Sequence, residues 1–168
     1  GNTYVHGKGY LPTPEVGRMD HRGWHHLGTN IDGALVRLDH DLDWIASTGE
    51  RWVAERRIWD LDAMSADEGW WSLRFRTTLT NVRGTDLEIG SPTTHGRPMA
   101  GYGGLFWRGP RDFANPGATV LGPDGRSDAD MMGHAARWLS FTGKHDGSDT
   151  VSTLLFIRSE EHTSELQS

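Results

Sequence analysis

The chain has 168 residues, of which 35% are hydrophobic and 24% charged, as in globular proteins. No apolar run is long enough to span a membrane, and a net charge of -6 without a dense basic cluster argues against a nucleic-acid partner. The absence of cysteine excludes disulfides, zinc–thiolate sites and thiol catalysis. We expect a soluble, cytoplasmic protein, although the start of the chain at Gly1 gives no information on export if the true N-terminus is missing.

Alternation of apolar and polar residues, and not helical periodicity, dominates the chain in its first half. Between residues 34 and 44, apolar side chains and His40 share one face of a predicted strand. The opposite face, which we expect to be solvated, carries Arg37, Asp39, Asp41 and Asp43. Residues 51–61 form a second predicted strand with mixed faces, and such a strand suits the lining of a polar cavity.

The remaining predicted strands follow in short succession, separated by turns rich in glycine and proline. They cover residues 70–82, a strand beginning at 87–89, and residues 105–107, 138–142 and 151–157. Residues 90–104 and 113–132 are predicted loops. Consecutive strands joined by short turns indicate antiparallel pairing, so we expect an all-β fold, an antiparallel β-sandwich formed by one domain over residues 1–157.

The polar residues 158–168 bear no relation to the strand before them. They match, codon by codon, the translation of a common sequencing adapter. We therefore expect a non-native tail without function, and a domain that is truncated at both ends.

A glycine-rich segment at residues 90–108, GSPTTHGRPMAGYGGLFWR, resembles the bacterial PmoA-like family, also labelled methane oxygenase PmoA. Weaker matches lie at residues 1–10, 17–24 and 137–139, and at Glu55. The resemblance implies a β-sandwich of unsettled function. Because family members accompany sugar-related oxidoreductases and glycan-utilisation genes, it favours a carbohydrate ligand. The family also carries a His-Pro-Trp-His-His-type motif upstream, which this chain lacks.

The glycine-rich loop supplies the first set of candidate site residues. Glycines allow a close backbone approach to a ligand, and arginine, histidine and aromatic side chains suit a hydroxyl-rich or anionic one. We expect substrate contacts from Arg97, Tyr102, Trp107 and Arg108. The alternative is a structural Ω-loop.

Glu55 and His95 are the candidate catalytic pair. A partly buried carboxylate on a strand could act as a general base with a raised pKa, and His95 as its acid partner. An ion pair between Glu55 and Arg57 is the alternative. His21 is a further candidate for substrate contact; with His25 and His26 it could hold a metal on a helix, but the segment is not helical in pattern, so we expect no metal and no cofactor.

These features predict a carbohydrate-related domain that resembles the galactose-mutarotase superfold and binds a sugar or another small molecule in a concave sheet face. Whether it is an enzyme is open. The alternatives are a non-catalytic accessory domain with the same ligand and a histidine-dependent metal oxidoreductase.

Overall fold

A computed structural model describes residues 3–5, 9–11, 16–31, 34–94, 96–100, 105–114 and 116–159. The chain divides into two compact units, Gly1–Ile89 and Gly90–Ser168. In the first unit the strands are β1 (Thr3–Val5), β2 (Gly9–Leu11), β3 (Arg18–Ile31), β4 (Ala34–Ile45), β5 (Arg51–Ser65) and β6 (Trp70–Asn81). The second unit contains the 3-10 helices η1 (Arg111–Phe113), η2 (Pro123–Gly125) and η3 (Asp128–Met131), and the strands β7 (Thr119–Leu121), β8 (Trp138–Lys144) and β9 (Val151–Ile157).

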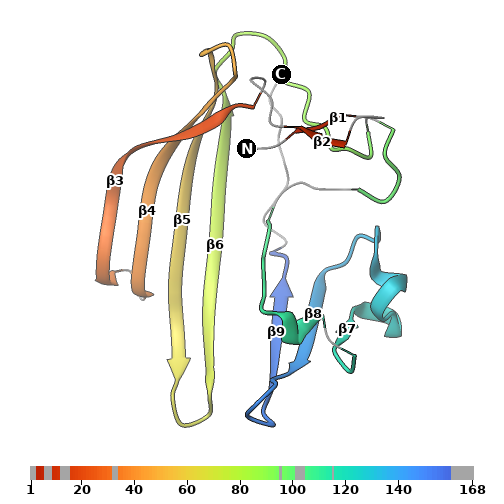
Figure 1. The fold of residues 1–168 in the computed structure, drawn as a ribbon. Helices are drawn as coiled ribbons and strands as arrows, with labels where there is room; N and C mark the ends of the chain where they lie inside the picture. The colour runs from red at the N-terminus through yellow and green to blue at the C-terminus, as the bar shows by residue number, and fades with distance from the viewer. Residues whose placement is uncertain are drawn as a thin grey trace. The chain divides into compact units, whose positions relative to one another are not determined.

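Every sheet is antiparallel, which confirms the predicted all-β fold. β3, β4, β5 and β6 pair in chain order and form one sheet of long strands joined by hairpins (Figure 1). β1 pairs with β2, and β7, β8 and β9 form a three-stranded sheet. The face-to-face packing of a sandwich stays a prediction. In the described part of the chain, no helix is long and apolar enough to cross a membrane.

β4 runs unbroken through the alternating segment, and β5 and β6 lie where the alternation predicts them. The prediction missed β3. Its pairing with β4 shifts between His21 and Gly23 and again between Trp24 and His26, which are the marks of two β-bulges. Because each bulge inserts a residue, the period-two pattern is interrupted twice and the strand is hidden in the sequence.

The structure differs from the prediction in three further short segments. Residues 87–89, in the first unit, and residues 105–107 adopt no strand, whereas β7 lies inside the predicted loop 113–132. β8 and β9 form the predicted hairpin. Trp107 packs against Phe113, Phe141 and Phe156, with ring centroids 5.3 to 5.8 Å apart. The apolar character of residues 105–107 therefore reflects the packing of Trp107 on aromatic rings, and not pairing as a strand.

Candidate functional site

The two faces of the β3–β6 sheet carry different chemistry. Registers place the odd-numbered residues of β4 opposite the even-numbered residues of β5 and β6, so these share one face. We call it the charged face; it includes Arg37, Asp39, Asp41, Asp43, Arg56, Asp60, Arg74, Arg76, Thr78 and Thr80. The other, the mixed face, includes His40, Trp44, Glu55, Arg57, Trp59, Phe75 and Thr77.

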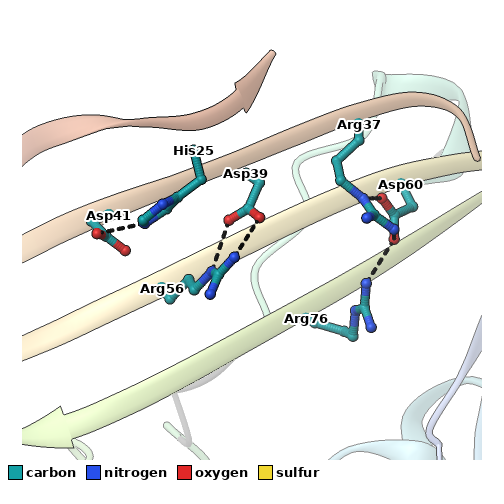
Figure 2. A network of polar contacts seen from close by, with 7 residues as sticks. All are labelled: His25, Arg37, Asp39, Asp41, Arg56, Asp60 and Arg76. Carbon is teal, nitrogen blue, oxygen red and sulfur yellow. Dashed lines mark hydrogen bonds and ion pairs between the residues drawn. The ribbon is translucent and has the colours of Figure 1, made fainter. Parts of the chain in front are cut away.

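Ion pairs between neighbouring strands cover the charged face (Figure 2). Arg37 donates two hydrogen bonds to the Asp60 carboxylate, at 2.6 and 3.1 Å, and Arg76 donates a third at 2.9 Å. Arg56 makes a bidentate contact with Asp39, with hydrogen bonds of 3.0 and 2.8 Å. Paired guanidinium and carboxylate groups of this geometry fix both side chains in position.

Asp39, Asp43 and Asp60 are buried, with 6%, 6% and 0% of their surface exposed. The prediction of a solvated aspartate face was therefore wrong at Asp39 and Asp43. Hydrogen bonds from Arg56 lower the pKa of Asp39, and hydrogen bonds from Arg37 lower that of Asp60 against the opposing effect of burial. The arginines of the adjacent strands thus replace water as partners of these carboxylates.

A depression of about 330 Å³ lies on the charged face. All four strands contribute to its lining, which consists of Arg22, Asp41, Leu42, Asp43, Arg51, Ala54, Glu55, Arg56, Thr78 and Thr80. Asp43 lies between two of the arginines, 2.6 Å from Arg51 and 3.2 Å from Arg22. β5 therefore lines a polar cavity, as its mixed faces predict.

Several lining groups keep hydrogen-bonding capacity that no side chain of the described residues uses. Arg51 pairs with Asp43 through Nη2, Arg22 through Nε, and Arg56 leaves Nη1 free. All three side chains are about half exposed or more. Thr78 and Thr80 are exposed residues on the same face. The depression therefore presents mainly hydrogen-bond donors to a ligand.

Glu55 lies on the mixed face and is only 3% exposed. Arg57 donates to both of its oxygens, at 2.6 and 2.9 Å. Trp44 Nε1 and Thr77 Oγ1 add one hydrogen bond each, both of 2.7 Å. Four donors fill the usual capacity of a carboxylate. The alternative interpretation, an ion pair with Arg57, is confirmed.

The pKa of Glu55 is lowered, and not raised as expected for a general base. Burial on its own would raise the pKa, but the hydrogen bonds from Arg57, Thr77 and Trp44 together outweigh it. The folded protein thus holds Glu55 as an anion at neutral pH. A carboxylate stabilised in this way is a weak proton acceptor.

His21 lies on the mixed face, in the same cross-strand row as Glu55, with Leu42 between them. Its ring is 4.9 Å from that of Trp24 and 5.2 Å from that of His40. Trp24 stacks on His40 at 4.8 Å. Burial, with the nearby charges of His21 and Arg57, lowers the pKa of His40, whose buried Nδ1 has no partner. His40 is therefore neutral at pH 7.

The histidines that adjoin in the sequence separate in space. His25 pairs with Asp41 on the charged face at 2.7 Å, whereas His21 lies on the mixed face. Among the described residues, no three histidine, aspartate or glutamate side chains come together in a way that could hold a metal ion. The bulges of β3 cause this separation, since each changes the face on which the next side chain lies.

The loop candidates lie in the second unit. The Arg97 backbone N–H donates to the Pro92 carbonyl at 2.9 Å, and the Arg108 guanidinium lies 5.9 Å from the Phe106 ring. Trp107 belongs to the aromatic cluster described above. His95 and Tyr102 lie outside the described residues. The structure brings Glu55 and His21 onto one face of one sheet, and the loop residues remain candidates within their own unit.

Sequence reasoning missed the arginines and threonines around the depression. Arg22 sits in a bulge of the undetected strand, and Arg51 precedes the regular part of β5. The alternation of arginine and threonine in β6 was visible, but only the strand register shows that these side chains meet the aspartates of β4.

An all-β domain whose long sheet carries a polar depression is the class that fold and site define. Comparison with family models assigns the chain more narrowly: residues 2–165 match the family of unknown function DUF6807, and the chain belongs to that family. No curated protein and no solved structure matches the chain. The matched range extends into the segment 158–168, whose non-native origin stays a prediction.

Proposed function

We propose that the domain binds a carbohydrate in the depression on the charged face of the β3–β6 sheet. The observation that carries the proposal is the set of unused hydrogen-bond donors of Arg22, Arg51 and Arg56, whose guanidinium groups are held by the buried carboxylates Asp43 and Asp39. Sugars present many oxygen acceptors at close spacing, and guanidinium groups fixed by carboxylates bind such oxygens without first losing side-chain entropy.

The dimensions and flanking groups of the depression support the same ligand class. A volume of about 330 Å³ lies at the lower end of small-molecule sites and suits one or two sugar rings. Thr78 and Thr80 add hydroxyls that both donate and accept, and Asp41 keeps one carboxylate oxygen beside its bond to His25. The resemblance of residues 90–108 to the PmoA-like family, found near glycan-utilisation genes, points to the same class.

Within this proposal Glu55 is an anchor of the sheet. Its four hydrogen bonds and lowered pKa suit a structural carboxylate better than a proton acceptor. Binding without turnover is therefore the function that the geometry supports best, and a catalytic pair of Glu55 and His95 is the second candidate.

Calorimetry of the full chain with neutral and acidic mono- and oligosaccharides tests the proposal. Arg22→Gln should weaken binding at least about tenfold, since a hydrogen bond from a charged donor contributes roughly 1.5–3 kcal/mol. Arg51 still neutralises Asp43 in this variant. Arg74→Gln is the matched control, because Arg74 lies on the same face and pairs with Asp62 outside the depression.

Binding of no sugar, or equal weakening by both substitutions, would contradict the proposal. Chromatography of the sugar after incubation separates the two candidates: binding alone returns it unchanged. A sugar consumed by the unmodified chain and spared by both Glu55→Gln and His95→Gln would instead support the catalytic pair.

A further inference from the structure

A serine, a histidine and an aspartate that belong to neither candidate site described above meet in the second unit. His145 Nδ1 lies 2.8 Å from Asp112 Oδ2, and His145 Nε2 lies 2.7 Å from Ser152 Oγ. Asp112 lies in η1, 33 residues before His145, which directly follows β8, and Ser152 lies seven residues after His145 in β9. A carboxylate on Nδ1 and a hydroxyl on Nε2 is the order of contacts in nucleophilic serine sites, which are recognised by geometry and not by sequence position.

Gly143 allows the three residues to meet. It pairs with Ser152 across the β8–β9 hairpin, and a Cβ atom at Gly143 would lie 2.8 Å from the Asp112 carbonyl oxygen. The missing side chain therefore lets η1 pack directly on the sheet beside His145. Asp112 reaches the imidazole because of this close approach.

The surroundings suit a small acyl group. Registers place Ser152 on the same face of the hairpin as Phe141 and Phe156, and the Phe113 ring lies edge-on to His145 at 5.9 Å. Ser152 therefore shares its face of the hairpin with an apolar row of aromatic rings. Ser152 itself is exposed, so a substrate reaches it from solvent.

A backbone donor lies next to the hydroxyl. The bond from His145 N–H to the Thr150 carbonyl fixes the alternation of the hairpin ladder, in which Gly143 and Ser152 then bond each other. The N–H of Thr153 consequently points away from β8. Since β9 is the edge strand of its sheet among the described residues, this N–H is open to a substrate oxygen.

We propose that Asp112, His145 and Ser152 form a nucleophilic site that hydrolyses small carboxylic esters. Ser152 Oγ attacks the ester carbonyl carbon while His145 Nε2 takes its proton; the carbon–oxygen bond to the alcohol then breaks, and His145 returns the proton to the leaving alcohol. Water attacks the acyl-serine in the same way and releases the carboxylic acid, so the balance is ester plus water to acid plus alcohol. Asp112 is a positioning residue that holds the Nδ1–H tautomer, and the Thr153 N–H stabilises the oxyanion.

Hydrolysis of p-nitrophenyl acetate and labelling by a fluorophosphonate test the site on the full chain. We expect one label on Ser152 by peptide mass spectrometry, and a rate at least about 100-fold lower in Ser152→Ala. Ser148→Ala is the matched control, since Ser148 lies in the turn between β8 and β9 and its hydroxyl contacts Thr150 and not the His145 ring. Equal rates in the two variants, or no label on Ser152, would overturn the proposal.

Asp112→Asn separates positioning from a structural role. We expect kcat to fall at least about 100-fold with little change in KM, because the amide favours the wrong imidazole tautomer. Thermal denaturation of each variant shows that the fold is retained. Unchanged kcat in a folded Asp112→Asn protein would contradict the assignment of Asp112.

Discussion

The two faces of the β3–β6 sheet both bury carboxylates, but they neutralise them differently. Asp60, on the charged face, lies between Arg37 and Arg76, so two cations share one anion. Glu55, on the mixed face, has one arginine and completes its bonding with Trp44 and Thr77. The excess of guanidinium groups leaves donors free on the charged face, whereas on the mixed face Glu55 already accepts four hydrogen bonds and has no acceptor position left for a ligand. Ligand capacity therefore follows from the type of partner and not from burial alone.

The largest effect should come from Asp60→Ala. Removing this fully buried carboxylate leaves Arg37, whose side chain is 14% exposed, without its main partner. We expect the free energy of unfolding to fall by about 3–5 kcal/mol, as when one member of a buried pair is lost. Urea titration measures it.

Asp62→Ala is the control on the same strand. Asp62 has a single partner, Arg74 at 3.1 Å, and is more exposed than Asp60. Its loss should cost about 1 kcal/mol or less. Similar losses at both positions would remove the distinction between the interior and the margin of the charged face.

A smaller loss, of about 2 kcal/mol, is expected for Glu55→Gln, because the charge that accepts from Arg57 disappears while the shape stays. Glu50→Gln is closely matched: Glu50 also accepts from a tryptophan, Trp52, and pairs with an arginine, Arg83, but it is exposed. That control should change by about 0.5 kcal/mol or less. Equal effects in urea titrations would show that burial of Glu55 is irrelevant.

The smallest effect concerns pH. His40 has a folded pKa below its ordinary 6.5, so the unfolded chain binds its proton first. Stability from this group is complete above pH 6.5 and is lost as the pH falls through the folded pKa. Glu55, Asp39 and Asp60, whose pKa values are also lowered, follow the same sign below their ordinary 4.5 and 3.8.

His40→Phe isolates the histidine, because phenylalanine keeps the stack on Trp24 and cannot titrate. Its free energy of unfolding should decline less between pH 7 and about pH 5 than that of the unmodified chain, because only the latter loses the contribution of His40. Parallel curves for the two proteins over this interval would show that His40 carries no pH dependence.

Sequence alternation sufficed where one strand obeyed period two throughout, as in β6. It failed in β3, where two bulges break the period, and at residues 105–107, where apolar content reflects aromatic packing on Trp107. A short apolar run in the sequence is compatible both with a strand and with a loop that packs on aromatic rings, so the run alone does not distinguish the two structures.

The site was less predictable than the fold for a different reason. Asp39 and Asp43 were predicted to be solvated because they belong to the polar half of the alternating pattern of β4. Their burial depends on Arg56 and Arg51, which belong to another strand. The local sequence of one strand does not show which residue of the neighbouring strand lies opposite, so these ion pairs could be assigned only from the strand register.

The two bulges of β3 also bear on how related sequences should be aligned. One extra residue at each bulge reverses the facing of the chain, and the second reversal restores it, so that His21 and Leu27 end on the same side. A relative lacking one residue at Arg22 and another at His25 would keep His21 and Leu27 on the same face, although it would lose the two side chains at the bulges. A gap at only one of these places would turn the residues between the bulges, or those beyond them, to the opposite face, so the two gaps should be placed together when related sequences are aligned.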